Sequence, residues 1–201
     1  MSLWRGKYPL ILASQSRARQ ALLANAGIEF EAVAAEIDER AVQQASSLSA
    51  PGDIAALLAR EKALSVSTRP GNFVIGADQT LALGTRLFSK PGSRAQAAEQ
   101  LRTLAGQSHE LHSAVAVARD GKLLFEGAAT ARMIMRRLGE AKIEAYLNEA
   151  GAAVTSSVGA YQLEGLGVHL FERVEGDHFT ILGLPLLPLL AFLRSERLLA
   201  V

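Results

Sequence analysis

Asp78 stands at the end of an apolar run, Phe73 to Ala77, with only small residues just before it. A carboxylate at the mouth of a buried strand is costly to hold unless a metal ion or a reaction uses it. The alternative is that Asp78 only starts a turn, because Asp side chains bond readily to nearby backbone groups. We take Asp78 as the first candidate for chemistry.

A hydroxyl-rich segment follows a second apolar run, Leu10 to Ala13, and opens a helix with an apolar face. It carries Ser14, Ser16 and Arg19. Free backbone N–H groups and the positive end of a helix dipole attract anions, and hydroxyls with an arginine would complete a phosphate cradle. The alternative is that Ser16 is only an N-cap and the arginines are solvated.

Two further segments carry charges suited to phosphate chemistry. Glu36-Ile37-Asp38-Glu39 groups the oxygen donors that Mg²⁺ requires, although such clusters are usually solvated loops. Ser89-Lys90-Pro91 places a lysine beside a proline, as a fixed cation that would meet the charge on phosphoryl oxygens. Most lone lysines near turns lie on the surface, so Lys90 gains weight only from its neighbours.

The segment from Ile54 to Leu64 predicts an amphipathic helix. At about 100° per residue, its apolar stripe consists of Ile54, Leu57, Leu58 and Leu64. Glu61 falls near the centre of this stripe and Lys62 on its flank. The alternatives are a structural ion pair that holds the helix down, or a Lys62 side chain that reaches into a cleft to meet phosphate.

The elements that must position these residues alternate between strand and helix patterns, which favours an α/β domain. The predicted strands are Leu10 to Ala13, Phe30 to Ala34, Phe73 to Ala77, Leu111 to Ala118, Thr130 to Met135 and Val168 to Val174. The predicted helices are Arg17 to Ala26, Ile54 to Ser67, Arg94 to Leu104, Glu140 to Ala150 and Leu186 to Leu193. Asp53 and Ser93 are expected to cap the second and third helices.

Two connections complete this outline. Asp120-Gly121 predicts a hairpin turn between Leu111 to Ala118 and Lys122 to Phe125, so we expect a mixed sheet. The polar stretch Gln43 to Gly52 predicts a surface loop within a domain. The four histidines match no zinc motif and are expected to be structural; they are His109, His112, His169 and His178.

The composition suits a single packed domain over residues 1–201, with 49% hydrophobic and 20% charged residues. Lys and Arg number 21 against 20 Asp and Glu, so no overall basic field predicts a nucleic-acid partner. The chain has no cysteine, which excludes cysteine-held metal centres and suits a reducing cytosol. Because no apolar run is long enough to span a bilayer, we expect a cytoplasmic protein with no membrane partner.

Taken in this order, the segments resemble the Maf-like nucleoside triphosphate pyrophosphatases. The likeness extends from about Leu10 to Leu193, and although each motif is short, their order and spacing make chance agreement improbable. The matching pieces are Leu12-Ala13-Ser14-Gln15-Ser16 with Arg19, Asp38-Glu39, Arg60-Glu61-Lys62-Ala63, Ile75-Gly76-Ala77-Asp78, Lys90-Pro91, Gly106-Gln107-Ser108-His109, Gly159-Ala160-Tyr161 and Gly183-Leu184-Pro185-Leu186.

The resemblance implies hydrolysis of a nucleoside triphosphate between its α and β phosphates, with a divalent cation, Mg²⁺ or Mn²⁺. It implies an elongated mixed α/β fold, similar to that of inosine triphosphate pyrophosphatases, with two lobes around a deep cleft. Relatives also suggest a homodimer.

Site roles follow from the same resemblance. Asp78 matches the general base that activates water, close to the metal, and Glu39 would help to hold the cation. The residues implied to hold the triphosphate and offset the charge of the transition state are Ser14, Ser16, Arg19, Lys62 and Lys90.

Three positions bear on the base. The pyrimidine branch, which prefers dTTP or UTP, typically has Thr and Gln where this chain has Gln79 and Glu164, and both exchanges resemble the 7-methyl-GTP branch. The Glu164 carboxylate would accept from the N–H edge of guanine or attract a methylated ring, and Gln79 can donate and accept. Ala18 replaces the large aromatic typical of that branch, so stacking on the base is unsupported. We expect a purine triphosphate, with 7-methyl-GTP as the example.

Other functions fit the same residues. A nucleotide-sensing or division-linked interaction protein would use the cleft without turnover, but it has little need for both Asp78 and Glu39 beside a metal. A phosphatase would release orthophosphate in place of pyrophosphate.

Overall fold

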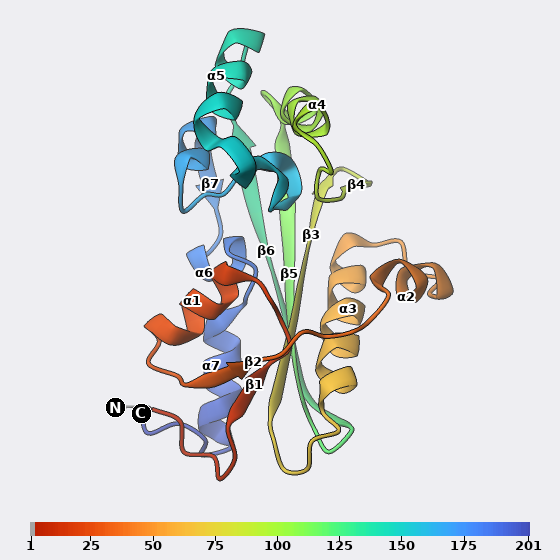
Figure 1. The fold of residues 1–201 in the computed structure, drawn as a ribbon, viewed down its shortest axis with the longest axis vertical. Helices are drawn as coiled ribbons and strands as arrows, with labels where there is room; N and C mark the ends of the chain where they lie inside the picture. Colours follow the sequence, from red (N-terminus) through yellow and green to blue (C-terminus); the bar gives the residue numbers. More distant parts are fainter. Residues whose placement is uncertain (1–2) are drawn as a thin grey trace.

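The computed structural model describes residues 3–201 as an elongated α/β fold built on one seven-stranded sheet (Figure 1). The strand order is β2-β1-β3-β5-β6-β7, with β4 attached to β3. The strands are β1 (Leu10–Leu12), β2 (Phe30–Ala32), β3 (Val74–Leu83), β4 (Arg86–Phe88), β5 (Ser108–Arg119), β6 (Lys122–Met135) and β7 (Phe171–Glu175). β1 pairs in parallel with β2 and β3, and the other pairs are antiparallel, so the predicted mixed sheet is confirmed.

Helices flank the sheet on both faces. They are α1 (Arg17–Asn25), α2 (Glu39–Ala45), α3 (Pro51–Val66), α4 (Arg94–Leu104), α5 (Glu140–Ala150), α6 (His178–Ile181) and α7 (Leu186–Ser195). Three short 3₁₀ turns follow α5, namely η1 (Gly151–Thr155), η2 (Val158–Ala160) and η3 (Leu166–Leu170). Within residues 3–201, no helix has the length and apolar character needed to cross a membrane.

The long strands β3, β5 and β6 join two groups of elements (Figure 1). One group, at the top of the view, contains α4, α5, β4 and β7; the other contains β1, β2, α1, α3 and α7. Each group has its own hydrophobic core, the first around Leu101, Met133 and Leu147 and the second around Leu12 and Leu189. The elongated two-lobed arrangement agrees with the fold that the family resemblance implies, whereas the deep cleft stays a prediction.

In the lower group, alternate residues of the long strands face different helices. Ala77, Val115 and Val117 pack with the leucines of α1 and α7 on one face. On the other face, the alanines of α3 meet Ala114 and Ala116 of β5. The period of two along each strand therefore points Asp78 toward α3 and its neighbour Ala77 toward α7.

The helix α3 packs unusually close to the sheet through small residues. A Cβ on Gly76 would lie 2.1 Å from the carbonyl oxygen of Ala59, so only glycine fits there. The buried side chains of α3 are Ile54, Ala55, Leu58, Ala59 and Ala63. The predicted stripe was therefore wrong at Leu57, Leu64 and Glu61, which are only half-buried, because alanines rather than leucines allow this close approach.

Several expected boundaries differ from the structure. The helix α3 begins at Pro51 after the N-cap Ala50, so Asp53 lies in its first turn and is no cap. Ser93 does cap α4, accepting a hydrogen bond from the backbone N–H of Gln96. The Asp120-Gly121 hairpin between β5 and β6 is confirmed, with positive φ angles of 50° and 73° at the two turn residues.

Other elements were not predicted. The strand β4 and the helices α2 and α6 are short, and a three- to seven-residue element carries little periodic signal. The predicted loop Gln43 to Gly52 is shorter than expected, because α2 extends to Ala45 and α3 begins at Pro51. The expected strand from Val168 begins only at Phe171, because η3 occupies the residues before it.

Candidate active site

The candidate site lies at an opening in the edge of the sheet. β1 is paired with β3 at Val74 and Ile75, and β4 is paired with it from Leu81 to Leu83. Among the strands of residues 3–201, none pairs with residues 76–80 on this edge, and Asp78 lies at the centre of that segment. Because β1 and β2 both run parallel to β3, the segments that follow their carboxyl ends lead toward this opening, where α/β proteins commonly bind ligands.

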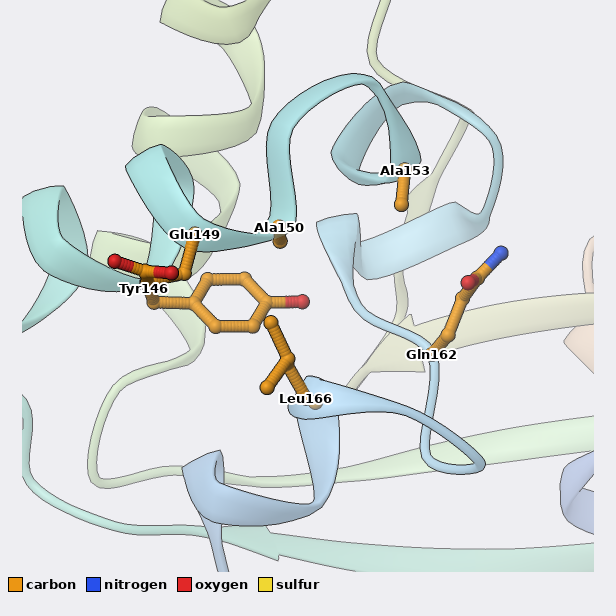
Figure 2. A pocket seen from close by; sticks show the side chains of 7 residues that line it. Tyr146, Glu149, Ala150, Ala153, Gln162 and Leu166 are labelled. Atoms are coloured by element: carbon orange, nitrogen blue, oxygen red, sulfur yellow. The ribbon is translucent and has the colours of Figure 1, made fainter.

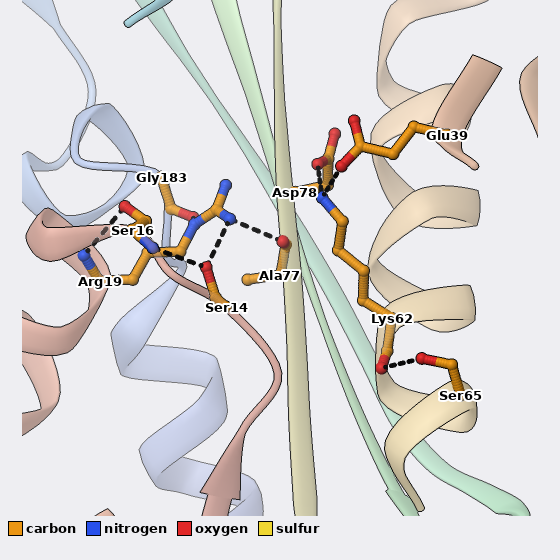
Figure 3. A network of polar contacts seen from close by, with 9 residues as sticks. All are labelled: Ser14, Ser16, Arg19, Glu39, Lys62, Ser65, Ala77, Asp78 and Gly183. Carbon is orange, nitrogen blue, oxygen red and sulfur yellow. Dashed lines mark hydrogen bonds and ion pairs between the residues drawn. The ribbon is translucent and has the colours of Figure 1, made fainter. Parts of the chain in front are cut away.

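Asp78 meets a lysine and a second carboxylate on the α3 side (Figure 3). The ammonium Nζ of Lys62 lies 2.6 Å from Oδ1 of Asp78 and 2.7 Å from Oε1 of Glu39. The side chains of Lys62 and Asp78 are only 12% and 11% exposed, while that of Glu39 is 53% exposed. Three segments that are distant in sequence thus share one ion-pair network with a buried half and an open half.

Local structure explains how each member reaches the network. Lys62 stands on the flank of the buried face of α3, and the close packing at Gly76 brings that flank next to β3. Glu39 is the first residue of α2, whose N-cap is Asp38. The Asp38 side chain accepts from the backbone N–H of Ala41. Of the acidic cluster, Asp38 therefore fixes the helix and Glu39 faces the site.

Arg19 forms the opposite side of the opening (Figure 3). Its Nε donates to the carbonyl oxygen of Gly183 at 2.7 Å, and its Nη1 donates to the carbonyl oxygen of Ala77 at 2.7 Å and to Oγ of Ser14 at 3.3 Å. A Cβ on Gly183 would lie 3.3 Å from the guanidinium, so a small residue is needed there. The guanidinium is thus fixed beside the strand that carries Asp78.

The two serines of this segment organise the start of α1. Oγ of Ser16 accepts from the backbone N–H of Arg19, so Ser16 is the N-cap, as one of the two sequence interpretations expected. Oγ of Ser14 accepts from the backbone N–H of Ser16 at 3.2 Å. Both hydroxyls lie at the positive end of the helix, and this capping role is compatible with an anion bound at the same end.

Burial and charge have opposite effects on the pKa values of Asp78 and Arg19. Burial raises the pKa of the Asp78 carboxyl, and the charges of Lys62 and Arg19 oppose that rise. Burial lowers the pKa of the Arg19 guanidinium, and the charges of Asp78 and Glu39 oppose it. A carboxylate with a raised pKa binds a proton more readily, which is the property that a general base requires.

Gln79 is one of the three positions linked to base choice, and its side chain is held by β5 and the α6 segment, on the face of β3 opposite to Asp78. Its Nε2 donates to Oγ of Ser113 at 2.8 Å and to the carbonyl oxygens of Thr180 and Ile181, each at 3.0 Å. Ser113 in turn donates to the carbonyl oxygen of Thr180 at 2.7 Å. The amide donors are therefore used within the protein, and Oε1 is the atom of Gln79 that would accept from a base.

Within residues 3–201, no side-chain hydrogen bond or ion pair links the remaining candidates to this network. Lys90 is exposed on the connection between β4 and α4, and Glu164 is exposed between η2 and η3. Ala18 is half-buried in the first turn of α1. Their roles remain predictions.

A pocket of about 120 Å³ lies elsewhere, between α5, η1, η3 and the segment that precedes η3 (Figure 2). Its lining residues are Tyr146, Glu149, Ala150, Ala153, Gln162, Leu166 and Gly167. None of the candidate residues contributes to it, so this pocket is separate from the Asp78 site.

The groups that hold Gln79 and Arg19 in place were not found from the sequence. Gln79 donates to the hydroxyl of Ser113 and to the carbonyl oxygens of Thr180 and Ile181. Arg19 donates to the carbonyl oxygen of Gly183. Because every residue has a backbone carbonyl, residue types do not reveal such partners. The one available signal was the glycine of Gly183-Leu184-Pro185, which marks a close approach of backbone and side chain.

The donors at the site suit a divalent cation. Glu39 and Asp78 place carboxylate oxygens around one position, and Mg²⁺ is typically bound by one or two carboxylates together with water and substrate phosphates. Among residues 3–201, no group of three or more histidine or acidic side chains is arranged to hold a metal by itself. The residues therefore fit a cation that shares its coordination with a phosphate ligand.

Comparison with known proteins assigns the family. Residues 9–196 match the family described as Maf-like protein, and the chain belongs to it. A nucleoside triphosphate pyrophosphatase of Bradyrhizobium diazoefficiens is 72% identical over the whole of both chains, and one of Rhodopseudomonas palustris strain BisB18 is 67% identical over the same extent. A 7-methyl-GTP pyrophosphatase of Brucella abortus is 52% identical over 94% of this chain and 96% of its own.

A solved HAM1 protein of Coxiella burnetii superposes on 64% of this chain and 73% of its own, with a TM-score of 0.42 and 17% identity.

Proposed function

We propose that this protein hydrolyses a nucleoside triphosphate between the α and β phosphates and releases the nucleoside monophosphate and pyrophosphate. The observation that carries the proposal is the convergence of Glu39, Lys62, Asp78 and Arg19 on one opening in the sheet. The names of the relatives that match the whole chain support it, because both describe nucleoside triphosphate pyrophosphatases.

Each side chain has a role in this reaction. Asp78 accepts a proton from the attacking water, since burial raises the pKa of its carboxyl. Lys62 and Arg19 offset the negative charge that builds on the phosphoryl oxygens. Ser14 and Ser16 would bind phosphate oxygens at the start of α1, and Lys90 would reach the triphosphate from the connection before α4. Positioning and electrostatics supply most of the rate enhancement in such transfers.

The reaction is proposed to depend on a divalent cation, Mg²⁺ or Mn²⁺. Glu39 and Asp78 are the residues that would hold it, and when bound it would neutralise charge on the phosphates and orient them. Asp78 would accept the proton from the attacking water, and the cationic side chains of Lys62 and Arg19 would bind the phosphates.

The substrate is proposed to be a purine triphosphate such as 7-methyl-GTP. The acceptor Oε1 of Gln79 and the carboxylate of Glu164 both suit N–H groups on a base edge. The 52% identical relative named for 7-methyl-GTP supports this choice. Ala18 leaves the base without an aromatic partner at that position. A dTTP- or UTP-selective enzyme is the alternative, in which pyrimidine triphosphates would be cleaved faster.

The decisive experiment incubates the purified protein with a panel of triphosphates that includes GTP, 7-methyl-GTP, dTTP and UTP, with Mg²⁺, Mn²⁺ or EDTA. We expect pyrophosphate and a monophosphate, with a purine preferred and no turnover in EDTA. Orthophosphate with a diphosphate would identify a phosphatase instead. Binding without any product would favour the nucleotide-sensing or division-linked protein.

Two further proposals come from the sequence, the first from the family resemblance and the second from composition and the lengths of the apolar runs. One is a homodimer, which light scattering on the purified protein tests directly. The other is a cytoplasmic location without nucleic-acid or membrane partners, which fractionation of cells that produce the protein tests.

A further inference from the structure

The position between Asp78 and Glu39 already holds a cation, which is the ammonium of Lys62. Its nitrogen lies at hydrogen-bond distance from both carboxylates, 2.6 Å from Oδ1 of Asp78 and 2.7 Å from Oε1 of Glu39. These are the two side chains proposed to hold the divalent ion. The ammonium and the metal would therefore compete for the same pair of oxygens.

Displacing this ammonium without a substitute is unfavourable. Its side chain is 12% exposed and that of Asp78 is 11% exposed, so an unpaired charge would be left in a largely desolvated place. Lys62 can leave the carboxylates only if another anion receives it. A triphosphate bound at the start of α1, beside Arg19, would supply that anion.

The protein also offers few metal ligands of its own. Two carboxylates are available, and within residues 3–201 no third acidic or histidine side chain completes a metal-binding group. Mg²⁺ and Mn²⁺ need more oxygen ligands than these two side chains supply, and phosphate oxygens are the usual source of the others. The ammonium between the two carboxylates and the small number of protein ligands both indicate that a metal would bind tightly here only together with a phosphate ligand.

We propose that Lys62 is an internal cation that closes the divalent metal position until a nucleotide arrives. The triphosphate draws the ammonium from Asp78 and Glu39, and the two carboxylates then accept the metal together with phosphate oxygens. Metal and nucleotide consequently bind with positive coupling, and each raises the affinity for the other by the same factor. The inference rests on the proposed function for the identity of the triphosphate ligand.

The test measures Mn²⁺ binding to the nucleotide-free protein by electron paramagnetic resonance, which needs no turnover. The variant Lys62→Met removes the ammonium and keeps a chain of similar length. We expect this variant to bind Mn²⁺ at least about tenfold more tightly than the unaltered protein, because two carboxylates are freed. Lys142→Met, which removes an exposed lysine of α5, is the matched control and should bind Mn²⁺ as the unaltered protein does.

A second pair of variants guards against a folding defect. Lys62→Gln should show the same gain with a polar side chain, and thermal unfolding checks that each variant folds cooperatively. Combining Lys62→Met with Asp78→Asn should abolish the gain, which locates the new affinity at the carboxylate pair. Unchanged or weaker Mn²⁺ binding in folded Lys62→Met and Lys62→Gln would overturn the proposal.

The result also separates this inference from the proposed function. If the unaltered protein cleaves triphosphates and the Lys62 variants gain no Mn²⁺ affinity, the internal-cation proposal is wrong while the function stands. If the variants gain affinity and no triphosphate is cleaved, the position is a cation site and the proposed function is wrong.

Discussion

Gly76 and Ala59 approach so closely that a Cβ on Gly76 would lie 2.1 Å from the Ala59 carbonyl oxygen. This contact places α3 directly against β3, two residues before Asp78 and one turn before Lys62. The short Lys62–Asp78 ion pair depends on that spacing, since a wider gap between helix and strand would separate the ammonium from the carboxylate. A packing feature without any chemistry of its own therefore sets the geometry of the candidate site.

We expect Gly76→Ala to lower the free energy of unfolding by about 3 kcal/mol or more, because α3 must move away from β3. Urea denaturation followed by circular dichroism measures this loss. Gly52→Ala in the first turn of the same helix is the control, since the nearest atom to its added Cβ lies 3.7 Å away. It should leave stability unchanged or raise it by less than about 1 kcal/mol. Equal effects of the two changes would contradict the packing argument.

Asp78→Asn should reduce pyrophosphate release by about a thousandfold or more, because an amide cannot accept the proton of the attacking water. The amide has the same shape, so cooperative unfolding and much of the nucleotide affinity should remain. Asp53→Asn, an exposed residue in the first turn of α3, serves as the control with full activity. Near-normal turnover in the Asp78 variant would remove this residue as the base.

Glu164→Gln should change the ranking of nucleotides more than it changes the overall rate, because the substitution removes a charge that the proposed base contact uses. The preference for a methylated, positively charged guanine over GTP should fall about tenfold, the effect of losing about 1.4 kcal/mol. The measurement is kcat/KM for 7-methyl-GTP and GTP. Glu172→Gln, on the exposed side of β7, is the control, and an unchanged ranking in Glu164→Gln would discard this specificity argument.

The buried His109 should make stability depend on pH. Its Nε2 lies 2.7 Å from the Tyr161 hydroxyl, and burial lowers the pKa of His109 to about 4. In the unfolded chain the pKa of this histidine is about 6.5. The contribution of neutral His109 to folding stability is therefore fully present above that pH and is lost as the pH falls toward about 4. The loss should approach about 3 kcal/mol.

Urea unfolding of the wild-type protein and His109→Gln between pH 8 and pH 4 isolates this contribution, since the other titrating groups are common to both. The variant should be less stable at pH 8 but should lose less stability on acidification. Parallel curves would show that His109 does not account for the acid sensitivity.

The sequence by itself determined the alternation of strands and helices, the hairpin at Asp120-Gly121 and the residue types that suit phosphate chemistry. These features are local, because periodicity, turn chemistry and capping depend on neighbours in the chain. It also marked Asp78, Lys62 and Glu39 as separate candidates. Short elements such as α2 and β4 were missed, since a few residues carry too weak a pattern.

Only the tertiary structure decided that Lys62 joins Asp78 and Glu39 at a single nitrogen and that Arg19 is held by carbonyls of Ala77 and Gly183. The reason is that these contacts depend on the distance between α3 and β3 and on backbone oxygens, which every residue possesses. Residue type can state that a charge needs a partner, but packing across the sheet decides which partner it finds.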